Sequence, residues 1–166
     1  MMLRHAAAIL LLPTIVAIVL PAIMLAAPGD SRWADGGWLV AAARGVGAVL
    51  LALGIGLFGW CVALFARVGR GTLAPWDPTR ELVATGPYRL VRNPMITGVA
   101  LVLIAQTLWW GSWRVALWTG AFVIVNHVYF LAAEEPGLQR RFGVAYDAYA
   151  ARVPRWIPRP RRRRSR

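Results

Sequence analysis

Gly86-Pro-Tyr-Arg-Leu-Val-Arg-Asn-Pro-Met-Ile-Thr-Gly98 is the stretch around which this chain of 166 residues is organised. It is polar and rich in turn-forming residues, and it leads directly into an apolar segment at residues 95–110. The turn at residues 111–113 joins that segment to a second apolar segment at residues 115–133, and the glutamate pair 134–135 follows. This pattern predicts a helical hairpin that has a polar segment at its start and two carboxylates at its end.

The composition is that of a membrane protein. Of all residues, 58% are hydrophobic, against about 45–50% in ordinary soluble domains, and the mean hydropathy is +0.54. Two further apolar runs, residues 6–27 and 39–66, are long enough to cross a bilayer. We therefore expect an all-α, polytopic helical bundle of about four transmembrane helices. It forms one domain over residues 1–166, with two N-terminal spans in residues 6–66.

The first two runs each carry a feature that affects this interpretation. The run at residues 6–27 follows Arg4 and His5, so a signal peptide is the alternative to a retained helix. Its length favours a retained helix, in which neighbouring helices satisfy the backbone groups that prolines leave free. The second run contains small residues at helical spacing that permit close helix contact, namely Gly45, Gly47, Gly54, Gly56 and Gly59.

The positive charge is sorted by position along the chain. The formal net charge is +12, and all 19 basic residues are arginine. Most of them lie at the start, in the connection at residues 67–93 and after residue 139, whereas the loop at residues 28–37 and the turn at Gly111 hold few. The positive-inside rule then predicts an integral protein of a bacterial inner membrane with both termini in the cytoplasm. The stretch at residues 86–98 and the glutamate pair fall on that same side.

Several other classes of protein are disfavoured. The sequence contains no GxGxxG fingerprint, P-loop, HExxH or CxxC pair. The lone Cys61 lies in an apolar run and has no partner for a metal site, so we expect no metal. The arginine run at residues 161–164, in a basic tail at residues 159–166, would contact anionic lipid headgroups rather than nucleic acid.

The fourth apolar segment offers a polar helix face. At about 100° per residue, Asn126, Phe130 and Glu134 lie on one face of a helix, while Glu135 points about 100° away. We therefore expect Glu134 to be the inward carboxylate. The alternative is that both glutamates are solvated at a helix end, beside arginines. His127 shares the same face, where a packing role is the alternative to a chemical one.

The motifs of residues 80–158 resemble those of the integral-membrane methyltransferases, which include isoprenylcysteine carboxyl methyltransferase and the phospholipid methyltransferases. The matching residues are Leu82-Val-x-x-Gly-x-Tyr-x-x-x-Arg-Asn-Pro-x-x-x-Gly98, then Glu134-Glu135, then Phe142-Gly-x-x-Tyr-x-x-Tyr-x-x-x-Val-Pro154. Each piece is weak alone, but the order and spacing together are specific. The resemblance implies that residues 80–158 are the catalytic region.

The resemblance also implies that the cofactor is S-adenosyl-L-methionine. The implied reaction is methyl transfer to a lipid or prenylated amphiphile that enters from the bilayer. The resemblance further implies roles for particular residues. By position, the catalytic residues would be Asn93 and Glu134, with Glu134 facing the ammonium group of the cofactor. The residues expected to bind the cofactor are Arg80, Glu81, Leu82, Val83, Tyr88, Asn93, Pro94, Met95, Ile96, Glu134 and Glu135. Those expected to bind the acceptor are Arg92, Asn126 and Phe130.

Two departures from the family pattern leave alternatives open. Asn93 stands where the family usually has histidine, so an acid–base role at this position would be lost, although a binding role would not. Phe130 stands where isoprenylcysteine enzymes carry an arginine for the substrate carboxylate, which favours the phospholipid type. A binding protein that has lost the activity is one alternative. An NADPH-dependent membrane reductase is another, because sterol reductases resemble this C-terminal hairpin region.

Overall fold

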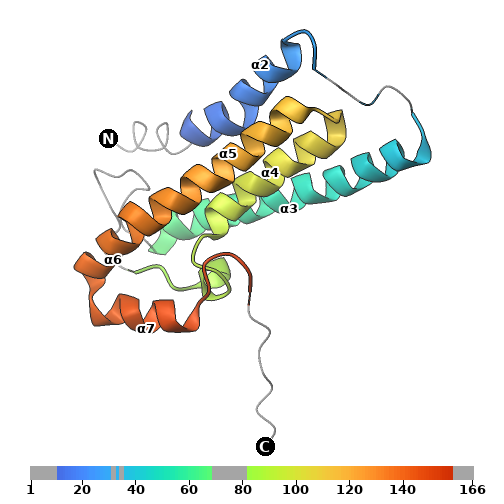
Figure 1. Cartoon of the computed structure of the whole chain (residues 1–166). Coiled ribbons are helices and arrows are strands. Elements are labelled where there is room, and N and C mark those ends of the chain that lie inside the picture. The colour runs from blue at the N-terminus through green and yellow to red at the C-terminus, as the bar shows by residue number, and fades with distance from the viewer. Residues whose placement is uncertain (1–10, 31–32, 34–35, 69–81, 159–166) are drawn as a thin grey trace, which may run out of the picture.

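The structure, a computed structural model, describes residues 11–30, 33, 36–68 and 82–158, and every regular element in these ranges is a helix. Figure 1 shows the elements along the chain. They are η1 (Ile15–Val19), α2 (Leu20–Ala26), α3 (Trp38–Val68), η2 (Gly86–Arg89), α4 (Pro94–Trp110), α5 (Trp113–Tyr129), η3 (Phe130–Glu134), α6 (Glu135–Phe142) and α7 (Val144–Arg152). The predicted all-α bundle is confirmed. The predictions for Arg4, Arg80, Glu81 and the basic tail concern residues outside the described ranges.

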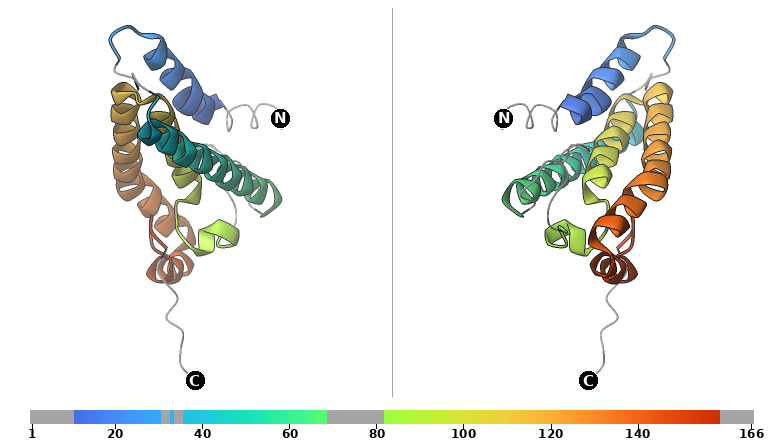
Figure 2. Two further views of the ribbon diagram at one scale, coloured as in Figure 1. Left: turned by 90° about the vertical axis from the view of Figure 1, so that its right-hand side faces the viewer. Right: turned by 90° about the vertical axis from the view of Figure 1, so that its left-hand side faces the viewer.

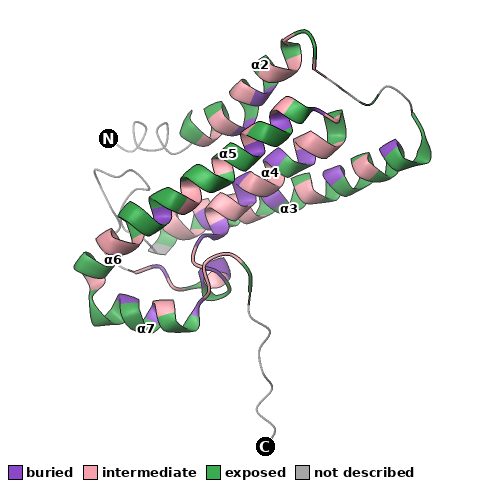
Figure 3. Cartoon of the chain, in the orientation of Figure 1, coloured by how far each residue is buried: buried purple, intermediate pink, exposed green. Residues whose placement is uncertain are grey.

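The long helices have the properties of membrane spans. Residues Trp38–Phe65 and Trp113–Phe142 are each long and apolar enough to cross a bilayer. Only 11% and 17% of their most apolar windows are buried within the chain, whereas a core helix of a soluble protein is mostly buried. Figure 3 shows this exposure along both helices. The helices at Leu11–Ala26 and Pro94–Trp110 are also apolar but shorter, so the number of spans stays a prediction.

Glycine sets the closest approach in the bundle, where α3 crosses α4 (Figure 2). A Cβ atom on Gly54 would lie 2.7 Å from the carbonyl oxygen of Gly98, and one on Gly98 would lie 3.0 Å from that of Gly54. Gly47 approaches Ala105 in the same way. The predicted close contact through glycine is thus confirmed for two glycines of α3. The other three, Gly45, Gly56 and Gly59, have no neighbouring atom within 4 Å of a Cβ built on them.

The proline in α2 is accommodated by its neighbours. Pro21 has no N–H to donate to the preceding turn, which is the π-helical η1. The carbonyl oxygen of Val16 accepts instead from Trp118 Nε1 at 2.9 Å, and that of Ala17 accepts from Gln106 Nε2 at 2.7 Å. Since a hydrocarbon environment offers no water, these two side chains satisfy the backbone of α2.

The loop after α2 closes over the α4–α5 turn at one end of the bundle. Trp33 Nε1 donates to the carbonyl oxygen of Leu108 at 2.8 Å, and Arg114 donates to Ala27 at 3.1 Å. Gly111 adopts φ +63°, and a Cβ on it would lie 2.7 Å from the Trp33 ring. The two segments predicted to share one side therefore do lie at the same end. Residues 82–93 and the C-terminal helices lie at the other end (Figure 1).

The last long helix does not end at residue 133 as expected. It continues through η3 and α6 to Phe142, so the glutamates lie inside a helix rather than at its C-terminus. Pro136 lacks the N–H that an α-helix would use there, and the turn before it is π-helical, with Glu135 N–H donating to the Phe130 carbonyl oxygen. This i→i+5 hydrogen bond breaks the count of 100° per residue from which Glu134 was expected to be the inward carboxylate.

Candidate functional site

Three segments that are distant in sequence meet where α4 begins and α5 ends. The C-terminal strap, residues 153–158, is held by main-chain bonds, because Arg92 N donates to Pro154 O at 2.9 Å and Asn93 N donates to Arg155 O at 3.3 Å. From α7, Tyr149 OH donates to the Tyr88 carbonyl oxygen at 2.8 Å. The polar stretch of the sequence is thereby fixed against the C-terminal region.

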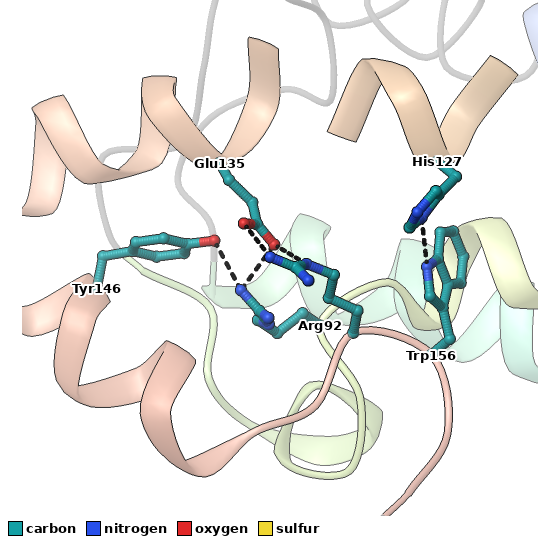
Figure 4. A network of polar contacts seen from close by, with 6 residues as sticks. Arg92, His127, Glu135, Tyr146 and Trp156 are labelled. Carbon is teal, nitrogen blue, oxygen red and sulfur yellow. Dashed lines mark hydrogen bonds and ion pairs between the residues drawn. The ribbon is translucent and has the colours of Figure 1, made fainter. Parts of the chain in front are cut away.

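Glu135 is the centre of a polar network at this junction (Figure 4). Arg92 Nη1 donates to Glu135 Oε1 at 2.7 Å and lies 3.4 Å from Tyr146 OH. Arg155 contacts both carboxylate oxygens, from Nε at 2.7 Å and from Nη2 at 3.0 Å. Two guanidinium groups therefore share one carboxylate.

The three charged groups differ in their exposure. The Arg92 side chain is 10% exposed, Glu135 16% and Arg155 40%. Hydrogen bonding to Glu135 raises the pKa of Arg155. Burial raises the pKa of Tyr146, although the hydrogen bond from Arg92 opposes that shift, so the Tyr146 hydroxyl stays protonated at neutral pH. The network is an interior ion pair, Arg92–Glu135, with a second arginine at its outer edge.

A cavity of about 310 Å³ adjoins this network. It combines carboxylates that suit cations or hydroxyl groups, guanidinium groups that suit anions, and an apolar wall. The lining residues are Arg92, Leu131, Glu135, Pro136, Gln139, Tyr146, Asp147, Ala150 and Arg155. The arrangement fits a ligand that carries both charges and has an apolar portion.

The start of α4 has hydrogen-bond donors without partners. Asn93 is 6% exposed, and its Nδ2 has no hydrogen-bond partner among the described residues. Arg92 Nε is likewise buried without a partner in that part of the chain. No side chain caps α4, whose first-turn amides carry the positive end of the helix dipole. The chemistry of this corner suits an anionic group.

An apolar cluster lies beside that corner. It joins Val83, Tyr88 and Met95 to the buried Cys61 of α3. Burial is the main reason why the pKa of Tyr88 is raised, and the Glu134 carboxylate adds to the shift. Leu82 instead packs against the tyrosines of α7. Most residues expected to bind the cofactor between positions 82 and 96 are therefore gathered around the start of α4.

The remaining predicted residues belong to the first turn of α4 and to the helix formed by α5 and η3. Glu134 is exposed and makes no hydrogen bond or ion pair with any other described residue. Asn126 Nδ2 donates to the Phe122 carbonyl oxygen of its own helix at 2.8 Å. Phe130 is 2% exposed and packs on Trp156, with ring centroids 6.4 Å apart. Pro94 is buried and Ile96 is half-buried.

Sequence reasoning assigned no role to several residues that line the cavity or hold its wall. Tyr146 and Tyr149 are the two tyrosines of the Phe142-Gly-x-x-Tyr-x-x-Tyr motif, so the signal for them was present. Arg155 follows the Val-Pro that ends the motif, and nothing in the spacing indicated that it would reach Glu135. Trp156 Nε1 donates to His127 Nδ1 at 3.0 Å, so this ring nitrogen acts as the acceptor.

This helical membrane bundle, with its polar cavity at one end, also matches known sequences. Residues 42–145 match the family described as phospholipid methyltransferase, which is more than half of the chain. The chain therefore belongs to the phospholipid methyltransferase family, and its class is that of the membrane methyltransferases. A protein of Haemophilus influenzae, described only as uncharacterized, is 35% identical over 63 residues, which are 38% of this chain and 100% of that protein. No solved structure matches the chain.

Proposed function

We propose that the protein transfers a methyl group from S-adenosyl-L-methionine to a lipid-like amphiphile that reaches the site from the bilayer. The observation that supports this most directly is the cavity at Glu135, next to the unpartnered donors of Arg92 and Asn93. Family membership supports the reaction type. The cavity supports the donor, because S-adenosyl-L-methionine carries a sulfonium, an ammonium and a carboxylate group on one molecule.

Each charged group of the cofactor has a counterpart in this chain. Glu135 offers a carboxylate in a half-enclosed position, where an ion pair is stronger than in bulk water. The start of α4, with Asn93 and Arg92, suits the carboxylate group. Leu82 and Met95, which are half-buried, and the buried Val83 are the apolar residues proposed for the adenine ring. Glu134 remains the predicted second carboxylate, near Tyr88.

The chemistry requires positioning more than it requires acid–base groups. When bound, S-adenosyl-L-methionine would supply an electrophilic methyl group, and transfer of that group to a nucleophilic atom of the acceptor would leave the bonding electron pair on sulfur. The protein contributes alignment and exclusion of water. His127 is not suited to act as a base in this conformation, because its Nδ1 lone pair accepts from Trp156. The proposed acceptor-binding residues are Arg92, Asn126 and Phe130.

The proposal predicts binding and turnover that can be measured separately. Purified protein in lipid nanodiscs should bind labelled S-adenosyl-L-methionine and should transfer label to a component of a membrane lipid extract, identified by mass spectrometry. NADPH added to the same protein should not bind. Cofactor binding without any labelled product would favour a protein that has lost the activity, and binding of NADPH alone would favour the reductase.

The placement of arginines predicts how the protein sits in the membrane. Arg67, Arg89 and Arg140 are among the arginines at the cavity end, whereas Arg44 and Arg114 lie at the other end. A reporter fused after residue 166 should be cytoplasmic, and one inserted at Gly111 should be external. The reverse result would separate the cavity from the cytoplasmic supply of cofactor. We also propose that the basic tail contacts anionic lipid headgroups.

A further inference from the structure

Arg155 stands out because it is a second cation on a carboxylate that already has one. Arg92, which is more deeply buried, already neutralises Glu135. Arg155 adds a two-point contact from the outer edge, with 40% of its side chain exposed. The remaining polar groups that line this part of the cavity are Tyr146, Gln139 and Asp147, and Gln139 Nε2 donates to Asp147 Oδ1 at 3.2 Å. Glu135 itself therefore has two cations and carries only one negative charge, although Asp147 on the same cavity wall balances the second cation.

The backbone around Arg155 is fixed although its side chain is not enclosed. The carbonyl oxygens of Pro154 and Arg155 accept from the amides of Arg92 and Asn93. The next residue, Trp156, is held by its hydrogen bond to His127 and by packing on Phe130. The guanidinium group can therefore leave Glu135 by side-chain rotation alone, while the strap stays in place.

We propose that Arg155 is a cofactor-binding residue that exchanges its partner. In the empty cavity it pairs with Glu135, and in the loaded cavity it pairs with the carboxylate of an α-amino-acid zwitterion whose ammonium group takes its place on Glu135. This inference rests on the proposed function and names the residue that selects the amino-acid end of the donor. A zwitterion allows this exchange without leaving any charge unpaired. The Arg155–Glu135 ion pair is replaced by two, one between Arg155 and the ligand carboxylate and one between the ligand ammonium group and Glu135. Glu135 meanwhile keeps Arg92.

The exchange is tested by removing the Arg155 guanidinium group and the carboxylate of the ligand separately. Arg155→Gln is compared with the unmodified protein and with Arg152→Gln. Arg152 is an exposed residue of α7 that donates to the Ala148 carbonyl oxygen of its own helix. Each protein is titrated with S-adenosyl-L-methionine and with decarboxylated S-adenosyl-L-methionine, which lacks the carboxylate. Thermal unfolding verifies that each variant is folded.

We expect Arg155→Gln to weaken binding of S-adenosyl-L-methionine at least tenfold and to change binding of the decarboxylated compound less than twofold. Arg152→Gln should change neither, and Arg155→Lys should give an intermediate loss for S-adenosyl-L-methionine. Equal weakening of both ligands by Arg155→Gln would overturn the exchange and make Arg155 a structural residue. Tighter binding of both ligands by Arg155→Gln would also overturn the exchange, because it would show that Arg155 only competes with the ligand for Glu135. Failure of the unmodified protein to bind either compound would instead refute the proposed function itself.

Discussion

Replacement of Glu135 by glutamine is expected to weaken cofactor binding strongly and to lower stability, whereas Glu134→Gln should do neither to a large extent. The reason lies in the partners of the two carboxylates. Glu135 pairs with Arg92 and Arg155, while Glu134 is exposed and makes no hydrogen bond or ion pair with another described residue. Removing one partner of a buried ion pair costs about 3–5 kcal/mol, and the partial exposure of Glu135 places the expected loss near the lower value.

The two variants make a matched pair, because each removes one negative charge and they are adjacent in sequence. Cofactor affinity should fall by about 1.5–3 kcal/mol, or roughly 10- to 100-fold, when a charged hydrogen bond is lost at Glu135. Isothermal titration in nanodiscs and thermal unfolding would give both quantities. A larger effect of Glu134→Gln than of Glu135→Gln would contradict the role inferred from the ion pairs of Glu135 and would restore Glu134 as the principal carboxylate.

Gly54→Ala is expected to disrupt the bundle, and Gly56→Ala, two residues away on the same helix, is expected to be tolerated. The new methyl group at position 54 would lie 2.7 Å from the Gly98 carbonyl oxygen and 3.0 Å from the Val102 amide nitrogen. Backbone atoms of another helix cannot turn aside as a side chain can, so the loss should reach the upper part of the range of about 1–3 kcal/mol for overpacking.

The control at position 56 has open space around the added methyl group. Alanine is favoured over glycine inside a helix by about 1 kcal/mol, so Gly56→Ala should leave stability unchanged or raise it slightly. Both proteins would be compared by thermal unfolding in one detergent. If the two substitutions had equal effects, the closest contact between α3 and α4 would have to lie elsewhere than at Gly54 and Gly98.

The sequence was sufficient to predict the helices because hydropathy and turn residues are local signals. The apolar run at residues 39–66 corresponds to α3 at Trp38–Val68, and residues 95–110 correspond to α4 at Pro94–Trp110. The register around the glutamates was a different matter. A count at 100° per residue assumes an uninterrupted α-helix, and the π-helical turn before Pro136 breaks that assumption. Pro136 is present in the sequence, but the sequence does not show that a π-helical turn forms before it.

The candidate site was predictable only in part, for a related reason. The stretch that begins at Gly86 and the pair Glu134–Glu135 do converge at one end of the bundle, as the arginine pattern indicated. The cation that completes the network comes from Arg155, which is 20 residues from Glu135 along the chain. That contact depends on the turn at Gly143 and on the direction that α7 takes after it. The helical repeat predicts which residues share a face within one helix, but it does not predict the direction of the chain after a turn.

The strap has a consequence for how the protein is made. Synthesis proceeds from the N-terminus, so residues 153–158 are made after all four apolar helices. Until then the Arg92 and Asn93 amides lack the carbonyl oxygens of Pro154 and Arg155. The polar end of the bundle therefore cannot be completed until the last residues of the strap have been added, and we expect the cavity to be among the last parts of the protein to form.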